Sequence, residues 1–160
     1  MKSRQEIILI AAMAENRVIG KDNAMPFTVK GNLARFKELT MGFPCIMGRK
    51  TWESLPKKPL PGRLNIIISK TLKNNNEALV FASLQSAIEH CAEYEKIFVI
   101  GGESIYKQAL PLANRIDLTL VTGQYEGDAF FPEIDDNWEK TDTIKFNYFS
   151  VINYVKIKQE

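Results

Sequence analysis

Two consecutive glycines, Gly101 and Gly102, stand where an apolar strand pattern changes into a helical one. Residues 97–100 are β-branched or aromatic, as in a buried strand, and the apolar residues of 105–112 repeat at helical spacing. A helix that begins directly after such a turn offers free N–H groups and the positive end of its dipole to a phosphate. Glycine lets that ligand approach the backbone. The pair is not a complete G-x-G-x-x-G motif, so a plain tight turn is the alternative.

Arg49 and Lys50 open another predicted helix, directly after the apolar strand pattern of residues 43–47. Positive charge at a helix N-terminus opposes the helix dipole, so a bound anion explains the pair better than solvation does. Paired cations together with N–H donors are what a phosphate clamp requires. A solvated helix start is the other interpretation.

The composition is that of one globular domain: 160 residues, 45% hydrophobic and 25% charged, enough for a real core. A net charge of +2 gives no case for binding nucleic acid or a membrane surface. The polar N-terminus does not resemble a signal peptide, and no long apolar run is present. Cys45 and Cys91 lie in apolar surroundings, and His90 is the single histidine. We therefore expect a cytoplasmic protein with reduced core cysteines, no metal site and a monomeric state.

Apolar runs alternate with helical patterns, which predicts an α/β fold with a mainly parallel sheet. The predicted strands cover residues 7–13, 43–47, 64–69, 78–81, 97–100 and 115–121, with antiparallel strand patterns at 138–146 and 148–158. The predicted helices cover residues 28–40 and 48–55, follow Ser83 as N-cap, and follow Gly102. Ligands of such sheets bind at the carboxyl ends of the strands. Residues 14–27 form a long loop without periodicity, and such loops are usually functional or mobile.

Several segments, in their order and spacing, resemble bacterial dihydrofolate reductases: Ile10–Ala12, Asn16–Gly20, Asn23–Phe27, Ile46–Leu55, Pro59–Arg63, Val99–Gly102 and Glu126–Asp128. The resemblance covers most of the chain and implies a single domain over residues 1–160. It implies an eight-stranded sheet with an antiparallel C-terminal strand and about four flanking helices. It also implies NADPH-dependent reduction of dihydrofolate, with hydride transfer to C6 of the pterin and protonation at N5. Antifolates are then expected inhibitors.

The resemblance implies an NADPH site made of Ala12, Ile19, Gly20, Asn23, Met25, Gly48, Arg49, Lys50, Thr51, Ile68, Ser69, Lys70, Ile100, Gly101, Gly102, Glu103, Ser104, Ile105 and Tyr106. Arg49, Lys50, Ser69 and Lys70 would cradle the 2′-phosphate, which favours NADPH over NADH. The family often carries a cation where this chain has Ser104, and we expect Lys70 to compensate.

The loop of residues 14–27 matches the mobile active-site lid of the family. By resemblance, Met25 covers the nicotinamide and helps to exclude water. Asp128 lies in a loop that hydrogen-bonds the closed lid in relatives, although a plain Gly-Asp turn explains it equally well.

The resemblance implies a dihydrofolate site made of Ile10, Ala12, Asn32, Leu33, Phe36, Lys37, Leu55, Arg63, Ile100, Tyr106 and Thr119, with Phe27 beside them. The candidate catalytic residues are Asn32, Thr119, Met25 and Phe27. Arg63 matches the arginine that grips the glutamate tail of folate, and Lys37 assists it. Without the resemblance, the apolar residues of this set would more often be core residues than ligand contacts.

Asn32 departs from the family pattern, which places an acid four residues before Phe36. In relatives that carboxylate accepts two hydrogen bonds from the pterin and promotes protonation at N5, and Thr119 bridges it to the pterin amino group. Glu38 should point away from the pocket and is a poor substitute. Losing a charged hydrogen bond costs about 1.5–3 kcal/mol in binding, and losing acid–base help costs ~10²–10⁴ in rate.

Three interpretations of the Asn32 site remain open. The first is an Asn variant of a dihydrofolate reductase, natural or engineered, with impaired turnover. The second is an NADPH-dependent reductase of another pterin or a pyrimidine whose donor pattern suits an amide. The third is a non-catalytic pterin or nucleotide binder, against which the lid, Arg63 and the phosphate cradle argue. We also expect weak binding of antifolates that bind as protonated diaminopyrimidines.

Overall fold

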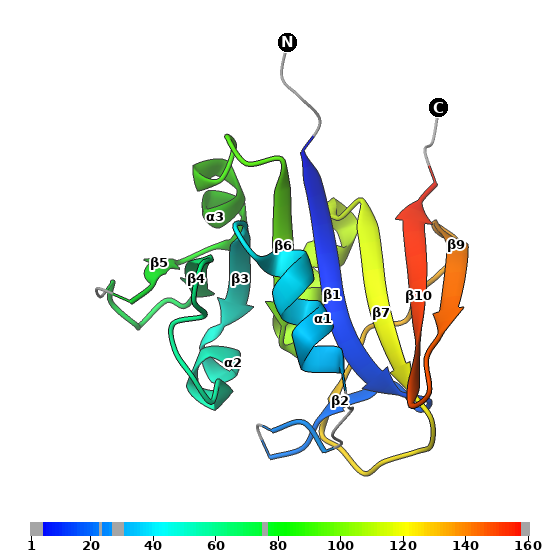
Figure 1. Cartoon of the computed structure of the whole chain (residues 1–160). Coiled ribbons are helices and arrows are strands. Elements are labelled where there is room, and N and C mark those ends of the chain that lie inside the picture. The colour runs from blue at the N-terminus through cyan, green and yellow to red at the C-terminus, as the bar shows by residue number, and fades with distance from the viewer. Residues whose placement is uncertain (1–4, 23, 27–30, 75–76, 158–160) are drawn as a thin grey trace.

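The computed structural model describes residues 5–22, 24–26, 31–74 and 77–157 and has an α/β fold with a central sheet (Figure 1). In chain order its elements are β1 (Glu6–Ala14), β2 (Val18–Gly20), α1 (Asn32–Thr40), β3 (Pro44–Gly48), α2 (Arg49–Ser54), β4 (Leu64–Ile68), β5 (Leu79–Phe81), α3 (Leu84–His90), β6 (Lys96–Gly101), α4 (Glu103–Ala109), a 3-10 turn (Leu110–Leu112), β7 (Arg115–Val121), β8 (Ala129–Phe130), β9 (Trp138–Lys145) and β10 (Phe149–Lys156).

The large sheet has eight strands in the order β5-β4-β3-β6-β1-β7-β10-β9. All pairs from β5 to β7 are parallel, whereas β10 pairs antiparallel with both β7 and β9. Among the described strands of this sheet, β10 alone therefore runs against the rest. The predicted mainly parallel sheet with an antiparallel C-terminal strand is confirmed. The carboxyl ends of β1, β3, β4 and β6 consequently meet at one edge, where ligands of such sheets bind.

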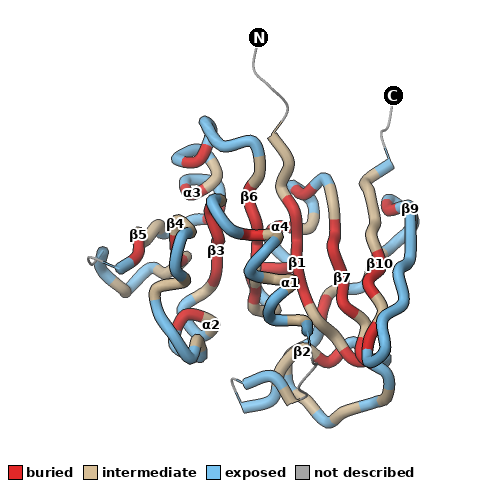
Figure 2. Tube along the Cα trace, in the orientation of Figure 1, coloured by how far each residue is buried: buried red, intermediate tan, exposed pale blue. Residues whose placement is uncertain are grey.

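Hydrophobic cores form on both faces of the sheet because side chains alternate along each strand. Leu9 of β1 belongs to the core under α3 and α4, which also contains Tyr106. Its neighbour Ile8 belongs to the opposite core, where Trp52 of α2 and Phe36 of α1 pack. Figure 2 shows the buried segments concentrated on the central strands. The four α-helices of the described part of the chain thus cover the sheet in two pairs, and the predicted flanking helices are confirmed.

β7 is the strand that carries polar groups into the interior. Its residues Ile116 and Leu118 face the α3–α4 core, whereas Asp117 and Thr119 are buried on the other face. Asp117 lies opposite Ile10 of β1 in the parallel register. The face of β7 that meets α1 is therefore polar at its centre.

Two details of the predicted elements are corrected or bounded by the structure. Residues 18–20, predicted as part of a loop, form β2, which pairs antiparallel with β8. The helix predicted over residues 28–40 is described from Asn32 onward, and residues 27–30 lie outside the described residues.

Smaller predictions are also tested. The Ser83 cap is confirmed, since its Oγ accepts the Ser86 N–H at 3.1 Å at the start of α3. Cys45 and Cys91 are free and buried. None of the described helices has the length and apolar character that crossing a bilayer requires.

Candidate active site

A single cleft of about 1680 Å³ brings the predicted site residues together at the carboxyl-end edge of the sheet. Its walls come from α1, α2, the start of α4 and the ends of β1, β4, β6 and β7. Of the predicted residues it is lined by Ile10, Ala12, Ile19, Gly20, Met25, Asn32, Leu33, Phe36, Gly48, Arg49, Lys50, Thr51, Leu55, Ile68, Ser69, Lys70, Ile100, Gly101, Gly102, Glu103, Ser104, Ile105, Tyr106 and Thr119.

The remaining predicted residues lie elsewhere. Arg63 is outside the cleft wall: its Nη1 donates to Thr40 Oγ1 at 3.1 Å, and its guanidinium lies 5.9 Å from the centre of the Phe36 ring. Lys37 is exposed on α1 and does not line the cleft either. Asn23 and Phe27 lie outside the described residues. Arg63 is thus next to a ring that lines the cleft but does not itself line it.

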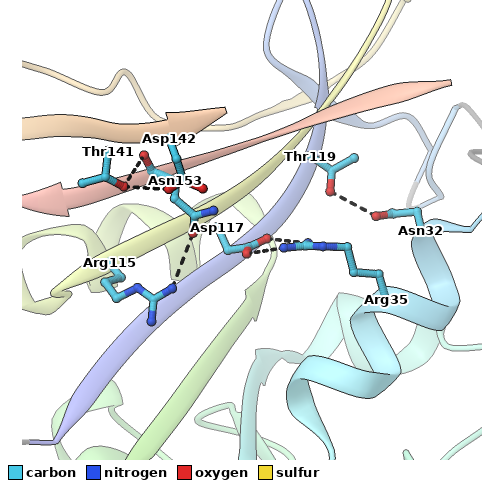
Figure 3. Close-up of polar contacts among 8 residues, drawn as sticks. All are labelled: Asn32, Arg35, Arg115, Asp117, Thr119, Thr141, Asp142 and Asn153. Carbon is cyan, nitrogen blue, oxygen red and sulfur yellow. Dashed lines mark hydrogen bonds and ion pairs between the residues drawn. The ribbon is translucent and has the colours of Figure 1, made fainter. Parts of the chain in front are cut away.

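Asn32 and Thr119 form the polar centre of the α1 end of the cleft (Figure 3). The Thr119 hydroxyl donates to Asn32 Oδ1 at 3.0 Å, joining the first residue of α1 to β7. Within the described residues, no partner is found for Asn32 Nδ2, so the amide has a donor left for a ligand. Glu38 is exposed and outside the cleft, as predicted.

An ion pair that was not predicted from the sequence lies directly beside this hydrogen bond. Arg35 of α1 donates from Nη1 and Nη2 to the two oxygens of Asp117, at 2.8 and 2.7 Å. Arg35 also lines the cleft. The one signal in the sequence is a charged residue, Asp117, between the apolar residues Ile116 and Leu118 of a strand. Nothing local indicates its partner, which is 82 residues away.

The Gly101–Gly102 turn is shaped by close packing against Tyr106. Gly101 has φ of +121°, and a Cβ added there would lie 3.2 Å from the Tyr106 ring. The Tyr106 hydroxyl donates to the backbone carbonyl of Ile10 at 2.8 Å. Burial raises the pKa of Tyr106, so the phenol stays neutral and acts as a fixed donor. Glycine at this point is therefore required by both conformation and space.

Cations gather at the α2 end of the same cleft. Arg49 and Lys50 form the first turn of α2, and Lys70 follows β4. Arg49 Nε lies 3.5 Å from Glu53 Oε2, an exposed i,i+4 pair that leaves other guanidinium donors available. Ser69 Oγ accepts the Leu72 N–H at 3.1 Å, which orders the loop after β4. This donor set suits a phosphate group.

Glu103, at the start of α4, already has a hydrogen-bond partner and an ion-pair partner within the protein. Its Oε1 accepts the Phe130 N–H at 3.0 Å, and Lys107 Nζ lies 3.0 Å from its Oε2. These contacts, with the Phe130 hydrogen bond as the largest cause, hold the pKa of Glu103 below its usual range. The carboxylate thus ties α4 to β8.

Besides the pairing of β2 with β8, side-chain contacts join the chain after β1 to the loop that precedes β8. The Asp22 N–H donates to Asp128 Oδ2 at 3.1 Å, and Lys21 Nζ lies 2.9 Å from Glu126 Oε2. Met25, further along this segment, lines the cleft but is half exposed. The Asp128 contact matches the prediction made for this residue from the resemblance.

Comparisons with known proteins find relatives that match most of the chain. A family model described as dihydrofolate reductase matches residues 6–155. A dihydrofolate reductase of Neisseria gonorrhoeae is 50% identical over 139 residues, 86% of each chain. One of Mycobacterium leprae is 46% identical over 136 residues, 81% of this chain and 82% of the relative. Dihydrofolate reductase HdrB of Haloferax volcanii is 37% identical over 158 residues, 92% of this chain and 81% of the relative.

Proposed function

The chain belongs to the dihydrofolate reductase family and is an oxidoreductase, and on that premise we propose that it reduces 7,8-dihydrofolate to 5,6,7,8-tetrahydrofolate with NADPH. The hydride goes to C6 of the pterin and a proton is added at N5. One observation carries the proposal: a single cleft joins a cation-lined end at α2 to a polar and apolar end at α1 and β7.

The residues at the α2 end fit a 2′-phosphorylated dinucleotide. Arg49, Lys50 and Lys70 supply the charge, and Ser69 supplies a hydroxyl, for the 2′-phosphate. Gly101 and Gly102 line the same cleft at the start of α4, where the backbone itself faces the cofactor. When bound, NADPH supplies the hydride. Met25 and the segment held by Asp128 exclude water from the nicotinamide.

The residues at the α1 end fit a pterin with an aromatic extension. Leu33, Phe36, Leu55 and Ile100 line this part of the cleft and supply apolar surface. The Arg63 guanidinium lies over the Phe36 ring, and we assign the glutamate tail of folate to it, with Lys37 assisting. That placement, beside a ring that lines the cleft, suits the distal end of a long substrate.

Asn32 limits the rate in this proposal. An amide does not ionise, so it neither balances charge on the pterin nor assists protonation at N5. The expected loss is ~10²–10⁴ in rate, the typical worth of general acid–base help. The Thr119 hydroxyl keeps its place beside the pterin because it is bonded to Asn32 Oδ1. The site therefore binds and orients the substrate, while the proton comes from water.

The Thr119–Asn32 hydrogen bond also supports a second candidate function. With Oδ1 facing Thr119, Asn32 offers an acceptor and a donor side by side. An edge of that kind complements a ligand that carries one acceptor next to one donor, whereas a carboxylate complements two donors. A different pterin or a pyrimidine with this pattern is then the substrate, reduced by the same cofactor.

The test is NADPH oxidation with dihydrofolate and with a dihydropterin that lacks the glutamate tail, with the products identified by chromatography. We expect slow formation of tetrahydrofolate. The KM for dihydrofolate should rise in Arg63→Met, and the KM for the tail-less pterin should not change. Lys140→Met, an exposed change on β9, is the matched control.

Preferential turnover of the tail-less pterin would replace the first candidate by the second. Binding of NADPH and dihydrofolate with no oxidation, in this chain and in Asn32→Asp alike, would make the protein a binder and contradict both.

A further inference from the structure

The N-terminal half of α1 has little apolar anchorage to the sheet. Among its residues only Thr40, at the C-terminal end, is fully buried, and Leu33 in the first turn is 73% exposed. The helix begins after Gly31, whose φ is +89°, and no side chain caps it. Something other than hydrophobic packing must therefore fix the turn that carries Asn32.

Two polar contacts join this half of the helix to β7. Asn32 and Arg35 are three residues apart and so lie on one face of α1. Thr119 and Asp117 are two residues apart and so lie on one face of β7. The pairs Asn32–Thr119 and Arg35–Asp117 are therefore parallel bridges between the same two elements, as Figure 3 shows.

The Arg35–Asp117 bridge is the more rigid of the two. Both Asp117 oxygens accept from Arg35, in the planar fork that carboxylate and guanidinium share. The Asp117 side chain is 6% exposed and the Arg35 side chain 23% exposed. A single hydroxyl–amide bond permits rotation about its axis, whereas two parallel bonds to a buried carboxylate do not.

The charges of Arg35 and Asp117 also neutralise each other at the wall of the cleft. Arg35 lines the cleft next to the uncharged Asn32, and Asp117 neutralises it. Without Asp117, a guanidinium would face the substrate end of the cleft. Without Arg35, a buried carboxylate without its charge partner would lie two residues from Thr119.

We infer that the Arg35–Asp117 ion pair is a positioning element for substrate recognition, which fixes the first turn of α1 against β7 so that Asn32 meets both Thr119 and the substrate. The inference deepens the proposed function and rests on it for the identity of the substrate. Arg35 and Asp117 act through Asn32, so they are positioning residues rather than catalytic ones.

The experiment compares Arg35→Met, Arg35→Lys and the double variant Arg35→Met/Asp117→Leu with the unaltered chain. We expect the KM for dihydrofolate to rise by about tenfold in Arg35→Met, the worth of one well-placed hydrogen bond. Arg35→Lys, which keeps the charge but not the fork, should restore part of the loss. The Kd for NADPH should stay within about twofold, because its phosphates bind at the other end of the cleft.

The double variant separates positioning from stability. Well-packed apolar residues commonly match a buried ion pair in stability, so its Tm should approach that of the unaltered chain. Its KM for dihydrofolate should stay high, because apolar contacts do not fix the orientation of α1 as paired hydrogen bonds do. The matched control is Arg115→Met, which removes an arginine from the same face of β7 where it contacts Glu6, away from the cleft. Arg115→Met should leave the KM unchanged.

A second readout needs no ligand. The side-chain amide resonances of Asn32, identified by their loss in Asn32→Asp, should shift in Arg35→Met and stay in place in Arg115→Met. A failed proposed function would show as no dihydrofolate turnover with these shifts still present. Unchanged Asn32 resonances in Arg35→Met, or a double variant with normal KM, would overturn the inference. If Arg35→Met does not fold, Arg35→Lys supplies both readouts.

Discussion

The two ends of the cleft are built by different means. The α2 end is shaped mainly by backbone, because β6 stops at Gly101 and α2 starts at Arg49. Its cationic side chains follow the ends of strands. The α1 end uses side chains that meet across elements, above all Asn32 with Thr119. A site shaped by backbone depends on positions where only glycine fits. A site built from side chains depends on the few polar atoms that those side chains present. One substitution can therefore change the chemistry of the α1 end while the α2 end stays intact.

The largest stability effect is expected at the backbone-built end. Gly101→Ala should lower the free energy of unfolding by about 2 kcal/mol or more, because its φ is +121° and its new Cβ would press on the Tyr106 ring. Gly42→Ala is the control: its φ is +86° but no atom lies within 4 Å of the added Cβ. It should cost about 1 kcal/mol. Equal losses for the two in urea unfolding would show that packing against Tyr106 does not matter.

A large binding effect is expected at the side-chain-built end. Asn32→Asp should tighten a protonated diaminopyrimidine inhibitor by about 10- to 100-fold, because the carboxylate forms a charged pair with it. Calorimetric titration measures this. Glu38→Gln, an exposed charge change on the same helix, should have no effect. Equal affinity of this chain and Asn32→Asp for the inhibitor would refute the assigned role of residue 32.

A smaller effect is expected for cofactor selectivity. Arg49→Met should weaken NADPH by about tenfold and leave NADH unchanged, because a charged contact to the 2′-phosphate is lost. Fluorescence quenching gives both dissociation constants, and Lys140→Met on the exposed β9 is the control. Parallel weakening of NADPH and NADH would place Arg49 elsewhere than at the 2′-phosphate.

The smallest effect is expected at the surface. Lys21→Met removes an exposed ion pair to Glu126 and should cost less than about 1 kcal/mol of stability. Turnover should change by less than about twofold, because Asp128 still accepts the Asp22 N–H. A larger fall in turnover would mean that Lys21, and not Asp128, holds this segment over the cleft.

The difference between local and long-range contacts explains which elements the sequence predicts. Apolar runs locate β1, β3, β4 and β6, and the Gly-Gly pair marks the turn before α4, because those signals are local. β2 has three residues and pairs with β8, more than 100 residues later, so no local pattern reveals it.

At the site, the limits have the same cause. The resemblance identifies Asn32 and Thr119, and the structure brings them to hydrogen-bond distance. Asp117 alone signals that β7 carries a polar interior, but its pairing with Arg35 depends on how α1 packs across the sheet. Arg63, expected at the ligand, contacts Thr40 and Phe36 because the turn before β4 carries it outside the cleft wall.

The central claim is that the site lacks an acid at residue 32. Its most direct test is the rate of dihydrofolate reduction between pH 5 and 8 for this chain and for Asn32→Asp. With Asn32 the proton comes from solvent, so turnover should fall by about tenfold per pH unit as pH rises. Asp should raise turnover ~10²–10⁴-fold and flatten that fall. Unchanged or lower turnover in Asn32→Asp would contradict the account and show that the site is built around the amide.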